Sequence, residues 1–360
     1  MVEELYDDKV DDYSEDEENT DFRFSITSYG ADYTVDRLVS RLRDNKIVIP
    51  EFQRQYVWDI KQASRFIESL ILGLPVPGVF FTQEKGTNKM LVIDGQQRLL
   101  SLQKFYDKKF GSQLFKLKNV QDDLEGKTID DLSTNDKNML DDSVIHATVV
   151  KQDSPTDDDS SIYMVFERLN TGGTKLAPQE IRACIYHGEL NKCLSELAEN
   201  DTWKQIYAAD NKRLKSQELI LRYFALLENY KEYTRGLKGF LNNYMEANKN
   251  PGEKKIAWLS QKFITTIETS YKIAGSNAFR IGKNINAAIF DSVMIALTIY
   301  SDSVPNIDYD HLSKAYRALL ADAEYLSYVE STTASQASVL GRIDRAIHFF
   351  CNGQINQRGL

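Results

Sequence analysis

The chain has 360 residues, of which 42% are hydrophobic and 27% are charged, and this composition excludes wholesale disorder, collagen and coiled coil. Three cysteines without clustered spacing exclude a disulfide framework. The sequence contains no run of about 20 uninterrupted apolar residues, so we expect no membrane span. The chain opens without the basic and apolar regions of a secretion signal. We therefore expect a cytoplasmic protein with reduced thiols.

The net charge of −9 is distributed unevenly. Residues 1–21 carry 11 acidic side chains and one lysine, which leaves the rest of the chain at +1. This segment has too few apolar residues to offset the entropy of ordering, so the sequence predicts a disordered acidic tail over 1–21. A solubilising tail is the simpler interpretation. The alternative is a mimic of nucleic-acid phosphate that folds back on a basic groove.

Short apolar runs alternate with amphipathic helices in the first half of the chain. Thr34 and Asp59 are candidate N-caps of two helices, each with apolar residues at three- and four-residue spacing. The runs 79–81 and 91–93 flank a turn and predict a hairpin, and a helix is expected directly after Gly95. A further strand is predicted over 145–150.

Helical periodicity dominates after the polar loop 152–160. Apolar stripes predict helices near 161–169, 178–199, 216–230, 256–273, 285–300, 309–328 and 334–351. The sequence therefore predicts an α+β protein in which a small mixed domain, beginning near Phe22, precedes an all-helical domain.

The most informative segment is the run from Met90 to Leu99, with the letters MLVIDGQQRL. A buried strand leads to Asp94, Gly95 permits a tight turn, and a helix starts at once, so backbone N–H groups converge at its positive end. Arg98 adds a fork that suits phosphate, and Asp94 could cap the helix or hold a hydrated magnesium ion. A capped strand-to-helix turn without a ligand is the equally weighted alternative.

Two other polar clusters stand out. The first, PEFQRQYVW over 50–58, suits either stacking against a base or an aromatic mini-core with polar edges. The second runs from Val165 to Arg182 and contains VFERLNTGGT followed by LAPQEIR. Much of this segment could serve only to end one helix at Gly172-Gly173 and to begin the next at Pro178. Alternatively, it could supply polar side chains to a site between two helices.

The basic stretch from Arg213 to Lys238 is interpreted as a solvated helix face, with phosphate contacts along DNA as the alternative.

Four sequence motifs of the first half of the chain occur in the same order as in a known protein family. PEFQRQYVW, ESLILGLPVPGVFF, VIDGQQRLLSL and VFERLNTGGTKLAPQEIR resemble the DUF262 family, which is related to the ParB/sulfiredoxin-like fold. The motifs cover about residues 22–190, which the resemblance implies to be the nucleotide-binding domain, and the helical domain over 191–360 is similar to the family's weaker C-terminal part. The resemblance implies a nucleotide-binding core of the kind found in modification-dependent restriction and other phage-defence systems.

The resemblance also implies roles for individual residues. Asp94, Gln97 and Arg98 would act in catalysis, and Asp94 and Glu167 would hold a metal ion. Contacts to the nucleotide would come from Gln53, Arg54, Gly95, Gln96, Arg168 and Asn170. The implied cofactor is a nucleoside triphosphate with Mg²⁺.

The expected function is that of an NTPase in a phage-defence or restriction system, with DNA and a separate nuclease subunit as partners. Many family members carry a His-Asn-His nuclease domain, but the four histidines of this chain, at 146, 187, 311 and 348, form no such motif. Two alternatives stay open. One is a non-catalytic nucleic-acid-binding or regulatory module that uses the same phosphate pocket, and the other is a nuclease that nicks DNA at the DGQQR segment itself.

Overall fold

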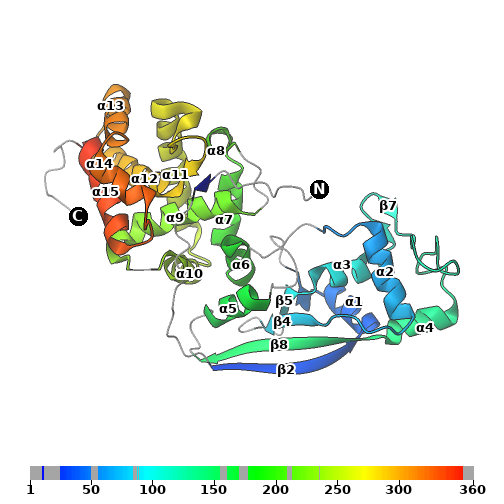
Figure 1. Cartoon of the computed structure of the whole chain (residues 1–360). Helices are drawn as coiled ribbons and strands as arrows, with labels where there is room; N and C mark the ends of the chain where they lie inside the picture. Colours follow the sequence, from blue (N-terminus) through cyan, green and yellow to red (C-terminus); the bar gives the residue numbers. More distant parts are fainter. Residues whose placement is uncertain are drawn as a thin grey trace. The chain divides into compact units, whose positions relative to one another are not determined.

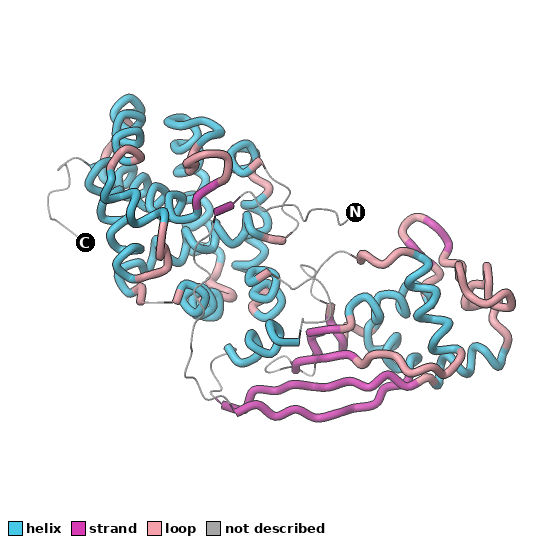
Figure 2. Tube along the Cα trace, viewed as in Figure 1, coloured by secondary structure: helices cyan, strands magenta, loops and turns pink. Residues whose placement is uncertain are grey.

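The computed structural model in Figures 1 and 2 describes residues 10–11, 25–49, 56–83, 87, 89–154, 160–169, 177–208, 213–234 and 236–351. The chain divides into two compact units. The sheet unit comprises Phe22–Leu176 with Ala183–Ile185, and the helical unit comprises Ala177–Arg182 and Tyr186–Leu360 together with Met1–Asp21. The division falls near residue 176, whereas the sequence placed it at 190. The expected α+β class, a mixed sheet followed by a largely helical region, is confirmed.

A mixed five-stranded sheet forms the centre of the sheet unit, with strand order β2-β8-β4-β5-β3. The β2/β8 and β4/β5 pairs are antiparallel, and the β8/β4 and β5/β3 pairs are parallel. The antiparallel pair β4/β5 is the predicted hairpin. The strands are β2 (Ser25–Thr34), β3 (Ile47–Val48), β4 (Val79–Gln83), β5 (Met90–Asp94) and β8 (Val144–Ser154).

The helices of this unit lie on both faces of the sheet. Side chains of α1 to α4 share one hydrophobic core with Val79, Phe81, Val92 and Ala147. The helix α5 packs against β5 and β8, where Leu91 and other strand residues outside this core are buried. The elements are α1 (Val35–Arg43), α2 (Ile60–Ile71), α3 (Gln96–Tyr106), α4 (Thr134–Asp142) and α5 (Ser160–Leu169), with a small hairpin of β6 (Lys109–Phe110) and β7 (Gln113–Leu114).

The two predicted N-caps of this unit behave differently. The Asp59 side chain accepts from the amide of Gln62, and the Gln62 side chain accepts from the amide of Asp59, so a capping box starts α2. Thr34 occupies the N-cap position of α1, but its hydroxyl donates to Asp36 and makes no capping bond. The spacing of apolar residues therefore located both helices correctly, and the cap chemistry is confirmed only at Asp59.

The helical unit is built around α12, whose residues are buried along most of its length. This helix packs against α9, α11 and α15 (Figure 1). The helices are α6 (Pro178–Ile185), α7 (Glu189–Ala198), α8 (Asp201–Tyr207), α9 (Lys215–Asn229), α10 (Leu237–Ala247), α11 (Glu253–Ala274), α12 (Ala287–Ser303), α13 (Tyr309–Leu319), α14 (Ala323–Glu330) and α15 (Gln336–Cys351), with 3-10 turns η2 (Tyr230–Glu232) and η3 (Gly275–Asn277).

Two predicted helices are each divided in the structure. The segment 178–199 breaks between α6 and α7 at Gly188, where an added Cβ would lie 2.5 Å from the carbonyl oxygen of Lys249. The segment 309–328 breaks before α14, whose N-cap Asp322 accepts from the amide of Tyr325. Apolar periodicity continues across both breaks because the flanking helices bury the same kind of face.

The acidic tail contributes one short strand. Val10–Asp11 forms β1, which pairs in parallel with β9 (Ile285–Asn286) of the helical unit. The expectation of disorder throughout 1–21 therefore does not hold for these two residues, and the remainder of the tail lies outside the described residues. Within the part of the chain that the structure describes, no helix combines the length and the apolar character that a membrane span needs.

Candidate functional site

The turn between β5 and α3 has the backbone geometry that the sequence suggested. Gly95 is the N-cap of α3 and lies in the left-handed region, with φ of 98°. An added Cβ would lie 2.5 Å from Cγ1 of Val79, so no other residue fits here without displacement. Glycine has no side chain that could cap the helix, and the first turn of α3 contains no acidic residue. The positive end of the α3 dipole is therefore not offset by its own cap.

Arg98 lies beside this turn, with its guanidinium fixed by two acceptors. Its Nη2 donates to Oδ2 of Asp94 and to the carbonyl oxygen of Gly78, each at 2.8 Å. The Arg98 side chain is 16% exposed and that of Asp94 is 42% exposed. The buried Nε of Arg98 has no hydrogen-bond partner within the described residues. The expectation that Asp94 caps α3 is wrong, because its carboxylate holds Arg98 instead.

Gln97 connects the turn to the segment that precedes α2. Its Oε1 accepts from the backbone amides of Val57 and Trp58, at 3.0 and 3.3 Å. This contact orders the end of the aromatic segment against the first turn of α3. Gln97 thus has a positioning contact in the structure, and the catalytic role implied for it stays a prediction.

The described aromatic residues of the 50–58 cluster pack into the protein. Tyr56 meets Phe110 edge-on, and its hydroxyl lies 2.8 Å from Oγ of Ser101. Trp58 meets Phe66 edge-on. Burial raises the pKa of Tyr56 above its usual value. For these two residues the mini-core interpretation is confirmed over base stacking.

The structure describes only some of the residues to which the family resemblance assigns a role at the site. Gln53, Arg54 and Asn170 lie outside the described residues. Glu167 and Arg168 are exposed on the last turn of α5. Within the described ranges, no group of three or more His, Cys, Asp or Glu side chains could hold a metal ion. The pairing of Glu167 with Asp94 at a metal stays a prediction.

The motif segments lie within a region that matches a known protein family. Residues 35–187 match the family of the GmrSD restriction endonuclease N-terminal domain, which is equivalent to DUF262. These residues form a GmrSD N-terminal domain. The resemblance read from the motifs is thus confirmed for this region, and domains of this family are part of modification-dependent restriction systems. A search of curated proteins found no significant match to the chain.

The last motif of the GmrSD N-terminal domain is buried. Arg182 is 2% exposed and donates from Nη1 to Glu218 and from Nε to Asn242, both at 2.9 Å. Glu180 accepts from the amide of Ala177 and lies 3.7 Å from Arg213. Glu180 and Arg182 thus make hydrogen bonds and ion pairs inside the helical unit, and their part in a site between two helices stays a prediction.

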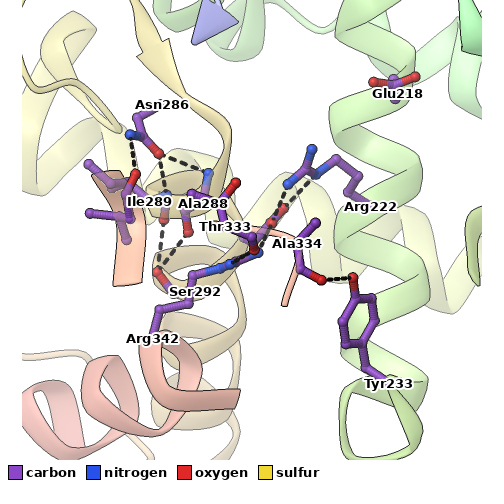
Figure 3. Close-up of polar contacts among 12 residues, drawn as sticks. Glu218, Arg222, Tyr233, Asn286, Ala288, Ile289, Ser292, Thr333, Ala334 and Arg342 are labelled. Carbon is purple, nitrogen blue, oxygen red and sulfur yellow. Dashed lines mark hydrogen bonds and ion pairs between the residues drawn. The ribbon is translucent and has the colours of Figure 1, made fainter. Parts of the chain in front are cut away.

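The basic stretch beyond the GmrSD N-terminal domain is also partly buried. Arg222 is 1% exposed and donates to both carboxylate oxygens of Asp291, at 3.1 and 2.7 Å. Figure 3 shows Arg222 approaching from α9 and Arg342 from α15; Arg342 donates to Asp291 at 2.8 Å and to the carbonyl oxygen of Thr333. For Arg222, both the solvated face and the contact along DNA are therefore wrong.

The three cysteines, at positions 184, 193 and 351, are all buried, and none forms a disulfide bond. Burial raises the pKa of the Cys351 thiol to about 11 and raises that of Cys193 above its usual value. At pH 8 only about a thousandth of Cys351 is thiolate, the reactive form. We expect the native protein to resist alkylation by iodoacetamide at pH 8, whereas the unfolded chain takes up three groups, as counted by mass spectrometry. Rapid alkylation of folded protein would contradict the buried placement.

Proposed function

We propose that the β5–α3 turn binds the phosphates of a nucleoside triphosphate and that the protein hydrolyses it as part of a modification-dependent restriction system. The observation that carries the proposal is the arrangement of Gly95 at the start of α3 beside the fixed guanidinium of Arg98. A helix start without an acidic cap is favourable for an anion, and a guanidinium held in place loses little entropy on binding phosphate.

Asp94 supports a role for magnesium at this site. One of its carboxylate oxygens accepts from Arg98, and the other has no such contact to that guanidinium. Mg²⁺ commonly takes one or two protein carboxylates and completes its shell with water and substrate phosphates, so a single carboxylate here fits an ion that arrives with the triphosphate. The ion would neutralise charge on the phosphates, and Arg98 and the α3 amides would orient them.

DNA is the proposed substrate of the whole system because the family is one of restriction endonucleases. The four histidines of the chain form no His-Asn-His motif, so we propose that a partner subunit cleaves the DNA. The non-catalytic phosphate pocket and the nicking nuclease make different predictions about turnover. The first predicts binding without release of phosphate, and the second predicts nicked DNA without a partner.

The proposal is tested by replacing Arg98 with alanine and measuring triphosphate binding with MgCl₂ by calorimetry. Loss of a charge-assisted contact of about 1.5–3 kcal/mol should weaken binding by about tenfold or more. The melting temperature should also fall, because Arg98 holds Gly78 and Asp94. Arg43→Ala is the control, since it removes one cation from an exposed ion pair with Asp107 in the same unit and should not change the affinity.

Two outcomes would overturn the assignment. Unchanged affinity in a folded Arg98→Ala variant would place the nucleotide elsewhere. The absence of binding by the wild-type protein to any of the four common ribonucleoside triphosphates would remove the nucleotide from the proposal.

A further inference from the structure

The strand β9 of the helical unit pairs with two other segments of the chain. The amide of Asn286 donates to the carbonyl oxygen of Phe279 at 2.9 Å, and Arg280 forms an antiparallel bridge with Ile285. The strand β1, from the acidic N-terminal segment, pairs with the same two residues of β9 in parallel. A strand has two edges, so the two segments occupy opposite edges of β9. The acidic segment therefore supplies the third strand of a small ribbon.

The edge of β9 that β1 occupies is held in place by the helix that follows it. The side chain of Asn286 accepts from the amides of Ala288 and Ile289, in the first turn of α12, and donates to the carbonyl oxygen of Val329 (Figure 3). These bonds fix β9 against the start of the central helix. A strand edge with a fixed geometry is a site for an extended segment, which gains main-chain hydrogen bonds there.

The segment around β9 is basic. Residues 269–290 contain Lys272, Arg280 and Lys283 and no aspartate or glutamate. Lys272 donates to a tyrosine hydroxyl, and Arg280 donates to backbone carbonyls, including that of Ile206 at 2.8 Å. Lys283 is exposed, and within the described residues none of these three cations forms an ion pair with a carboxylate. The three positive charges are therefore available to an anionic partner.

The charge of the segment that contains β1 is opposite. Residues 1–21 carry 11 acidic side chains and one lysine, a net charge of −10. Asp8 stands two residues before β1 in the sequence, and Lys283 stands two residues before β9. Because the two strands are parallel, the chain enters β1 and β9 from the same end. Strand pairing thus joins a strongly acidic segment to a basic one.

This contact is suited to release. A pair of two residues offers few hydrogen bonds, each of modest net strength in water. A tethered segment nevertheless acts at an effective concentration of about millimolar, which is enough to keep a weak site occupied. A competitor with a higher density of charge would displace it. Double-stranded DNA carries one negative charge per ~1.7 Å of its axis and is such a competitor.

We propose that residues 1–21 are an autoinhibitory segment that lies on β9 and competes with DNA phosphates for the cations of residues 269–290. The inference takes DNA as the substrate of the restriction system, as proposed above, and does not depend on the nucleotide site. DNA that contacts these cations releases counterions and displaces β1 from β9. Contacts of this kind position DNA without reading its sequence, because phosphates are the same at every base pair.

The test uses full-length protein with Val10→Pro and Asp11→Pro together. Successive amides of a strand point to opposite edges, so the double replacement removes the donor to β9 whichever residue provides it. Thr20→Pro with Asp21→Pro is the matched control, with the same loss of one negative charge outside β1. Affinity for a labelled DNA duplex at low KCl, measured by fluorescence anisotropy, should rise about tenfold in the first variant and stay at the wild-type value in the control.

Two further measurements separate strand pairing from charge alone. A synthetic peptide of residues 1–21 should inhibit DNA binding by the Val10→Pro/Asp11→Pro protein, and a peptide with the same two prolines should inhibit less. Lys283→Ala in that protein should lower the slope of log affinity against log salt by about one. Lys192→Ala is its control, because Lys192 is exposed and pairs with Glu196 on its own helix, and it should leave the slope unchanged.

Three outcomes would overturn the inference. Equal DNA affinities of wild type, the β1 variant and its control would show that β1 does not compete. Equal inhibition by the two peptides would show that charge acts without the strand. A β1 variant that does not bind DNA at low KCl would remove DNA as the competitor. Each result leaves triphosphate binding at the Gly95 turn untouched, and calorimetry on the same proteins measures that binding separately.

Discussion

Replacing Asp291 with alanine is expected to lower the free energy of unfolding of the helical unit by about 3–5 kcal/mol. The carboxylate of Asp291 is fully buried and accepts from two arginines, Arg222 and Arg342, that are also buried. Its removal leaves two cations without their counter-charge away from water, and desolvation of an unpaired buried charge is costly. Burial also lowers the pKa of Arg342, because this environment disfavours the charged guanidinium.

The measurement is denaturant unfolding followed by tryptophan fluorescence. The chain has three tryptophans, and Trp203 and Trp258 belong to the helical unit, so a Trp58→Phe background reports on that unit alone. Asp302→Ala is the matched control on the same helix, because Asp302 pairs with Lys262 and is 52% exposed. The Asp302→Ala substitution should lower the free energy of unfolding by less than about 1 kcal/mol. Equal losses of unfolding free energy in the two variants would show that the buried ion pairs of Asp291 do not contribute this stability.

A triple replacement separates the charge from the packing. Arg222→Met, Asp291→Leu and Arg342→Met together remove all three charges and keep similar volumes. Buried ion clusters are often replaced by apolar side chains at little cost or with a gain in stability. We expect the triple variant to be more stable than Asp291→Ala, because no buried charge is left without a partner.

Replacing Gly95 with alanine is expected to destabilise the sheet unit by about 2–5 kcal/mol and to abolish nucleotide binding. The residue has φ of 98°, which costs an L-amino acid about 1–2 kcal/mol, and the added methyl would lie 2.5 Å from Cγ1 of Val79. Relieving that overlap must move β4 or the start of α3, at an additional cost of about 1–3 kcal/mol. Either movement displaces Arg98 from Gly78.

Gly111→Ala is the matched control for this substitution. Gly111 also has a positive φ, of 61°, but an added Cβ would meet nothing within 4 Å. It should therefore cost only the backbone term, and the difference between the two variants reports the overlap with Val79. Calorimetric unfolding and a binding titration on each variant provide the measurement. Identical stabilities for the two alanine variants would contradict the close contact between Gly95 and Val79.

The sequence alone determined the elements that depend on neighbouring residues. Apolar spacing located α2 and the hairpin of β4 and β5, and Asp59 marked the start of a helix through its own cap. The motif order identified the family over residues that were later matched, because motifs are strings of adjacent residues. Local chemistry also predicted the glycine turn into α3, since the tight turn and the helix start are properties of a few consecutive residues.

Only the tertiary structure decided what the polar side chains contact. Asp291 interrupts an apolar helix, which signals a polar group in the core, but its partners Arg222 and Arg342 are 69 and 51 residues away. The pair of His146 with Asp32 spans 114 residues and follows from the register of β2 against β8. Register and helix packing arise from burial summed over whole elements, so a short pattern of letters does not encode them. The sequence by itself therefore identified the family and the turn at Gly95, and the folded chain decided which charges are buried together.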